Sequence, residues 1–206
     1  MRPDLLTVLS ERVVVADGAM GTMLQAAGGP DGLSLDDFEG YEGCNEVLNA
    51  TRPDVVKAVH AEYFSVGVDA VETNTFGCNL ANLGEYDIAD RIYELSESGA
   101  RHAREVADDF STPDQPRYVI GSIGPGTKLP TLGHAPYAAL RDAFQSEVAG
   151  LLDGGADALL VETAQDLLQA KAALIGANRA MRAAGRKIPL IAQVTIEQTG
   201  TMLLGS

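Results

Sequence analysis

Positive charge is scarce in this chain of 206 residues. It has 15 Lys and Arg against 29 Asp and Glu, which gives a formal net charge of −14. No basic run offsets this balance, so the field of the whole chain repels nucleic acids and anionic membrane surfaces. We therefore expect neither nucleic acid nor membrane as a partner.

Long apolar runs and cysteines are scarce as well. The apolar stretches are far shorter than the 18 or more residues that a membrane-spanning helix needs. The first 11 residues lack the apolar core of a secretory signal. Cys44 and Cys78 are far apart, which is typical of free thiols in a reducing compartment. Together with 46% hydrophobic residues, these features predict one soluble cytoplasmic domain over 1–206.

Short apolar runs alternate with helical patterns along most of the chain. A polar, glycine-rich connection covers roughly 26–43, and a helix begins at Pro53 and ends at Gly67. Strands are expected at 12–17, 68–76, 117–122, 156–162 and 188–196, and further helices at 88–110, 137–152 and 165–184. Near-continuous apolar strands joined by helices predict a parallel sheet covered by helices.

This pattern fits either an open doubly wound sheet or a (β/α) barrel. The segments 67–73 and 155–163 resemble each other, and in both an acid followed by threonine comes at the end of the strand. Asp17 has a similar place on the first strand. Polar residues at the carboxyl ends of several strands converge on one face only in a barrel, so we favour the barrel.

The expected barrel is incomplete. A (β/α)8 barrel takes about 250 residues, whereas only about five βα units are recognisable before the sequence stops at Ser206. We therefore expect a parallel α/β fold of the TIM-barrel type, truncated to about five units. Its fifth strand would be an open edge through which the chain could associate with itself.

Three acids stand where expected strands leave the core. Asp17 precedes small residues, and can either bind a substrate amine or cap the next segment. Glu72 and Glu162 each follow a buried apolar run, and an acid is costly to bury without a partner. Two or three such acids on one rim suit a cationic group such as an α-ammonium, with a structural salt bridge as the alternative.

A metal site is the remaining chemical alternative. Cys44, Cys78 and His134 fall in connections on the same expected rim, so a Cys2His zinc site is conceivable. The competing interpretation is two buried thiols and a surface histidine.

Five ordered motifs resemble the homocysteine S-methyltransferase family. They are Asp-Gly-Ala-Met-Gly-Thr at 17–22, Glu-Gly-Cys-Asn-Glu at 42–46, Glu-Thr-Asn-Thr-Phe at 72–76, Ser-Ile-Gly-Pro at 122–125 and Val-Glu-Thr at 161–163. Gly43-Cys44-Asn45-Glu46 and Thr199-Gly200-Thr201-Met202 favour the branch in which other domains carry methyl-cobalamin. The resemblance covers essentially the whole chain.

The resemblance implies the N-terminal part of a zinc-dependent barrel that methylates the sulfur of homocysteine to give methionine. By similarity, Asp17 and Glu162 hold the substrate's amino group. The backbone at Gly18 and Ala19, with Asn74 nearby, receives its carboxylate or shapes the pocket. The remaining barrel and the cobalamin and folate domains would be the partners in the parent enzyme.

One part of the family pattern is missing. The family's zinc-binding cysteines lie in a Gly-x-Asn-Cys and a Gly-Gly-Cys-Cys segment, and this sequence contains neither. A free thiol is only about 3% thiolate at pH 7, and zinc removes that limit. We therefore expect this chain alone to bind neither zinc nor cobalamin, to be inactive, and to bind homocysteine weakly. The alternatives are a non-catalytic assembly module and the replacement zinc site.

Overall fold

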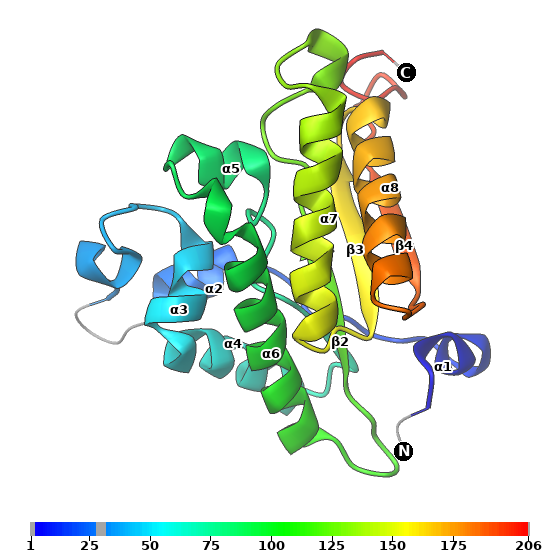
Figure 1. Ribbon diagram of the computed structural model, residues 1–206. Helices are drawn as coiled ribbons and strands as arrows, with labels where there is room; N and C mark the ends of the chain where they lie inside the picture. The colour runs from blue at the N-terminus through cyan, green and yellow to red at the C-terminus, as the bar shows by residue number, and fades with distance from the viewer. Residues whose placement is uncertain (1–2, 28–31, 206) are drawn as a thin grey trace.

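A parallel sheet of four strands forms the centre of the computed structural model, which describes residues 3–27 and 32–205. The strands follow one another in space as they do in sequence: β1 (Ala70–Glu72), β2 (Tyr118–Ile123), β3 (Ala158–Ala164) and β4 (Leu190–Val194). Each neighbouring pair is parallel. A helix lies between consecutive strands, as parallel pairing requires (Figure 1).

Helices account for most of the remaining chain. The α-helices are α1 (Leu5–Glu11), α2 (Gly21–Ala26), α3 (Leu48–Thr51), α4 (Pro53–Ser65), α5 (Leu80–Glu85), α6 (Ile92–Phe110), α7 (Tyr137–Asp153) and α8 (Leu167–Ala183). Short 3-10 helices cover Leu35–Phe38, Asn45–Val47, Ala89–Arg91 and Pro130–Leu132. Pro53 at the first position of α4 and Asp166, which caps α8 through its side chain, follow the usual chemistry of helix starts.

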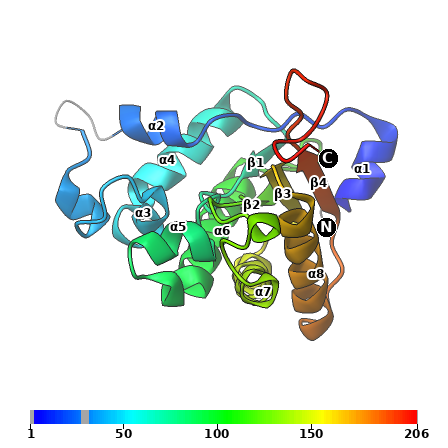
Figure 2. The same ribbon diagram turned by 90° about the horizontal axis from the view of Figure 1, so that it is seen from above.

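The long helices cover one face of the sheet, which we call the outer face. Figure 2 shows α6, α7 and α8 together on this side. Ile123, Leu159 and Val161 of the strands pack there against α7 and α8. Val71 and Val119 pack against α4 and α6. Burial of these side chains is the main stabilising contribution to the fold.

The opposite, inner face is divided along the strands. At the amino ends, Leu5 and Val8 of α1 pack against five strand residues, namely Ala70, Tyr118, Ile120, Ala158 and Leu160. Two residues further along the same strands, Glu72, Ser122 and Glu162 occupy the carboxyl ends. Because side chains alternate across a strand, these residues share the inner face with the apolar layer below them.

The predicted parallel α/β fold is confirmed, and four of the five expected strands are present with shifted ends. The strand expected at 12–17 is wrong: only Ala16 forms a bridge, to Ala70. Val13 and Val15 are 80% and 53% exposed, so the apolar run is not buried. This segment pairs on one side alone, and among the described residues no strand supports its other side.

The opposite edge of the sheet is open, as expected. Within the described part of the chain, β4 pairs with β3 alone. Four of the five residues of β4 are exposed. The expected helix at 88–110 begins as an α-helix only at Ile92, and α1, α2, α3 and α5 were not expected.

Two further expectations concern the chain's ends and connections. Residues 28–31 of the connection expected at 26–43 lie outside the described residues, and so does Ser206. In the part of the chain that is described, no helix is long and apolar enough to span a membrane.

An acid-lined candidate site at the carboxyl ends of the strands

A pocket of about 430 Å³ opens at the carboxyl ends of the strands. It is lined by Asp17, Gly18, Ala19, Met20, Gly21, Asn45, Glu46, Glu72, Thr73, Asn74, Phe76, Ser122 and Glu162. All five residues predicted to bind substrate are among them. The structure thus brings these residues together, while their role in binding stays a prediction.

Asp17 is held against the end of β1. Its backbone N–H donates to the carbonyl of Ala70 at 3.0 Å, and its Oδ1 accepts from the backbone N–H of Glu72 at 2.9 Å. Burial, together with the nearby charge of Glu72, raises the pKa of Asp17 to about 7. Burial and the charge of Glu162 likewise raise the pKa of Glu72 to about 7. These carboxyl groups therefore compete for protons near neutral pH.

An irregularity in β3 lies directly beside Glu162. The pairing register with β4 shifts between Val161 and Ala164, as at a β-bulge. Thr163 lies within this shift at φ = 54°, a left-handed conformation that a β-branched residue rarely adopts. The Oγ of Ser122 donates to Oε1 of Glu162 at 2.5 Å, which fixes the carboxylate at the pocket wall.

The electrostatic character of the pocket follows from its lining. Glu46 adds a fourth carboxyl group, and none of the described lining residues is Lys, Arg or His. Uncompensated carboxylates in a partly enclosed space favour a cationic ligand group and disfavour a purely anionic ligand. Among the described residues, these acids thus form no salt bridge within the protein.

The turn after Asp17 offers a different kind of contact. The hydroxyl of Tyr63 donates to the carbonyl of Ala19 at 2.9 Å and packs close to Gly18. Among the described residues, no backbone carbonyl accepts from the N–H of Gly18 or Ala19, but the hydroxyl oxygen of Tyr63 accepts from the Gly18 N–H. The Ala19 N–H is thus the better placed of the two to meet a ligand carboxylate beside the acids.

Asn74 is fixed by hydrogen bonds rather than free in the pocket. Its Nδ2 donates to the carbonyl of Asn45 at 2.8 Å and to Oδ1 of Asn49 at 3.0 Å. In return, Nδ2 of Asn49 donates to the carbonyl of Asn74 at 2.8 Å. Asn74 therefore shapes the pocket wall as part of a rigid network.

The residues of the alternative zinc site are not assembled. Cys44 and Cys78 are free and buried in one apolar cluster, whereas His134 is exposed and accepts at Nδ1 from the backbone of Leu129. Burial raises the pKa of Cys44 to about 12, and that of Cys78 is raised as well, which disfavours the thiolate ligands zinc needs. In the described ranges, no group of three or more His, Cys, Asp and Glu could hold a metal ion.

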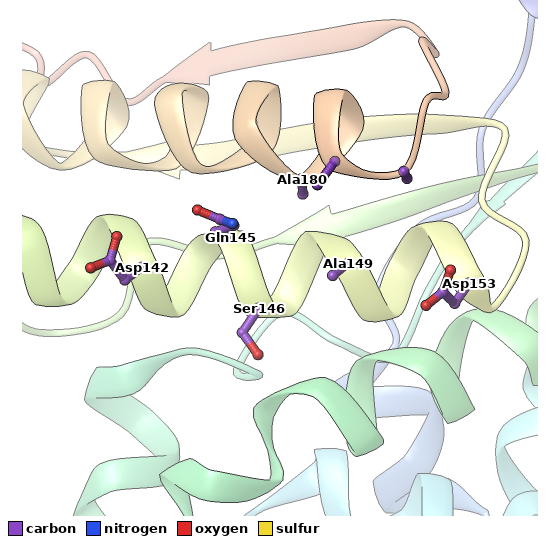
Figure 3. A pocket seen from close by; sticks show the side chains of 8 residues that line it. Asp142, Gln145, Ser146, Ala149, Asp153 and Ala180 are labelled. Atoms are coloured by element: carbon purple, nitrogen blue, oxygen red, sulfur yellow. The ribbon is translucent and has the colours of Figure 1, made fainter.

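A second hollow of about 500 Å³ lies between α7 and α8 (Figure 3) and shares no lining residue with the acid-lined pocket. Alanines line much of it, and the carboxylates at its two ends are already engaged. Asp142 pairs with Arg141 and Arg179, and Asp153 accepts from the hydroxyl of Tyr93. Without converging free polar groups, this groove is a weaker candidate for a ligand site.

Parallel βα units with an acidic pocket at the carboxyl ends of the strands define a protein of the TIM-barrel class. The chain belongs to the homocysteine S-methyltransferase family, whose model matches residues 14–206. It is 66% identical to methionine synthase of Mycobacterium tuberculosis and 64% identical to that of Mycobacterium leprae, each over 203 residues and 98% of this chain. The matched part is 17% and 16% of those proteins, so the chain spans about a sixth of their length.

Solved structures of more distant relatives share the fold. The metallated form of the homocysteine methyltransferase MmuM from Escherichia coli matches with a TM-score of 0.70 at 21% identity. The match covers 98% of this chain and 70% of that one. The apo form of the same protein matches with a TM-score of 0.67. The resemblance and the incomplete barrel predicted from the sequence are thereby confirmed.

Proposed function

We propose that this chain is part of the homocysteine-binding module of a cobalamin-dependent methionine synthase, and that residues 1–206 form one domain in the cytoplasm. The observation that carries the proposal is the pocket with several carboxyl groups and no basic residue in its described lining. High identity to methionine synthases over nearly the whole chain supports it.

In the proposed binding mode, the ligand's ammonium lies between Asp17 and Glu162. Glu72 adds negative charge beside them, and Ser122 keeps the Glu162 carboxylate oriented. The backbone at Gly18 and Ala19 receives the ligand carboxylate, with the Ala19 N–H as the better placed donor, and Asn74 closes the wall. Carboxylates that bind the ammonium and backbone N–H groups that bind the carboxylate would together orient an amino acid and leave its side-chain sulfur free for methyl transfer.

The residues of this chain do not fit the catalytic zinc of the family. The only two cysteines have buried thiols, and burial disfavours their ionised form. The chain therefore contributes binding and orientation, and we assign it no step in activating the sulfur. Cobalamin would belong to other domains of a longer protein, as would the remaining part of the barrel.

Calorimetry on the purified chain tests the proposal. We expect saturable binding of L-homocysteine and much weaker binding of 4-mercaptobutyrate, which has the same thiol and carboxylate but no ammonium. Zinc content measured on the same sample shows whether binding needs metal. Equal affinity for both ligands, or no binding of homocysteine, would contradict the proposal.

The open sheet edge supports a second candidate, an assembly module that associates with its own copies. Ile191 and Val194 of β4 are 37% and 50% exposed, and the nearby Ile196 is 55% exposed. Unprotected edges of this kind pair readily with other strands. Sedimentation should then reveal oligomers that Val194→Lys converts to monomers, whereas a strictly monomeric chain would refute this candidate.

A further inference from the structure

Glu46 connects the pocket lining to a loop that follows β1, although the two segments are far apart in sequence. Its carboxyl group lies at the edge of the pocket. Oε1 accepts from the backbone N–H of Gly77 at 2.8 Å, and Oε2 accepts from the thiol of Cys44 at 3.7 Å. The carboxyl group therefore bridges the connection before α3 and the loop after β1.

Gly77 is matched to this carboxyl group by shape as well as by hydrogen bonding. A Cβ at this position would lie 2.5 Å from Oε1 of Glu46 and 2.7 Å from its Cδ. The three nearest atoms to such a Cβ all belong to Glu46, and the φ of Gly77 lies outside the left-handed region. The glycine is thus needed for the close approach of Glu46, not for an unusual backbone conformation.

The loop held by Glu46 supplies one wall of the pocket through Asn74 and Phe76. The other side of this loop packs closely against Gly124, since a Cβ at that position would lie 2.2 Å from the carbonyl oxygen of Phe76. Within the loop, the hydroxyl of Thr75 donates to the carbonyl of Ser122 at 2.7 Å. The wall is therefore clamped between two segments, and Glu46 is the only acid among these contacts.

We propose that Glu46 is a positioning residue, whose carboxyl group clamps the loop at 74–77 so that Asn74 and Phe76 form the ligand-facing wall. The contact that matters is the acceptor oxygen for the Gly77 N–H, rather than the negative charge. The effect on homocysteine affinity rests on the function proposed above, whereas the clamp itself does not.

Two substitutions separate a clamp from a purely electrostatic role. Glu46→Gln keeps an oxygen that accepts from the Gly77 N–H but removes the charge. Glu46→Ala removes both. Loss of one buried hydrogen bond typically corresponds to about a tenfold change in an equilibrium constant. We therefore expect homocysteine Kd to rise about tenfold in Glu46→Ala and to stay within about threefold in Glu46→Gln.

Hydrogen exchange reports on the clamp without any ligand. In the full 206-residue chain, Glu46→Ala should speed exchange of the Gly77 amide and its neighbours, whereas Glu46→Gln should not. Glu42→Ala is the matched control, because this exposed glutamate lies in the same connection. Its Gly77 exchange rate and its homocysteine Kd should equal those of the wild type.

A double-mutant cycle adds a test that a general loss of stability cannot imitate. Gly77→Ala should be strongly destabilising in the wild-type chain, since its Cβ meets the Glu46 carboxyl group. In the Glu46→Ala background the same Cβ has room, so its cost should largely disappear.

Unchanged exchange at Gly77 in Glu46→Ala, equal loss in Glu46→Gln, or additive effects in the cycle would each overturn the clamp. If the wild-type chain binds no homocysteine, the proposed function fails, while exchange and the cycle still decide the role of Glu46.

Discussion

Replacing Asp17 with Asn should make the folded chain more stable above pH 7 while it weakens homocysteine binding. Burial and the charge of Glu72 raise the pKa of Asp17 to about 7, far above the value of about 3.9 in an unfolded chain. Between these values the folded chain binds more protons than the unfolded chain. The free energy of unfolding therefore falls as pH rises from about 4 to about 7, and asparagine does not share this loss.

The size of the effect has an upper bound set by the pKa. A rise to about 7 corresponds to at most about 4 kcal/mol. Glu72 competes for the same proton and solvent reaches the pocket, so we expect a gain of about 1–2 kcal/mol at pH 8. The Oδ1 of asparagine can still accept from the Glu72 N–H, so no hydrogen bond opposes the gain.

Urea unfolding at pH 5 and pH 8 measures this difference. Far-UV circular dichroism is the suitable probe because the chain has no tryptophan. Asp114→Asn, at an exposed aspartate, serves as the control and should change stability at neither pH. An Asp17→Asn chain no more stable than the wild type at pH 8, or one with an equally large advantage at pH 5, would refute the prediction.

Three further substitutions test the pocket and its frame. Glu162→Gln should raise the calorimetric Kd for homocysteine at least tenfold and leave 4-mercaptobutyrate unaffected, because a charge-assisted hydrogen bond to the ammonium is lost; an unchanged Kd would rule out this contact. Gly124→Ala should lower the free energy of unfolding by about 2–3 kcal/mol, since its Cβ would lie 2.2 Å from the carbonyl of Phe76; wild-type stability in urea would show that this loop yields freely. Thr163→Gly should leave the free energy of unfolding unchanged or raise it by up to about 1 kcal/mol, because relief of the left-handed φ outweighs the entropic cost of glycine. A loss of more than about 1 kcal/mol would contradict this prediction.

The order of elements was readable from the sequence because buried parallel strands and amphipathic helices leave different periodicities. The run at 12–17 misled that reasoning: its valines have strand propensity, yet a strand also needs partners, and Val13 is 80% exposed. Helix α5 was missed because its six residues carry too little periodicity, although Asn79 caps it through its side chain.

The pocket was partly readable for a similar reason. Glu162 follows an apolar run and lies near the end of a strand, whereas Asp17 follows a similar run that pairs only through the bridge of Ala16 to Ala70. Glu46 has no such signal, because its contact with Gly77 joins residues 31 positions apart. The sequence likewise does not indicate the left-handed φ of Thr163, since threonine seldom adopts it.

The division of the inner face has a consequence for how this site can change over evolution. Leu160 packs in the layer against α1, and Glu162, two positions later, faces the ligand pocket. One pleat of a strand thus separates residues that pack in the core from residues that line the pocket. New specificities can arise by exchanging the upper positions Glu72, Ser122 and Glu162 while the lower layer stays intact, so the fold can be inherited unchanged by proteins that bind different molecules.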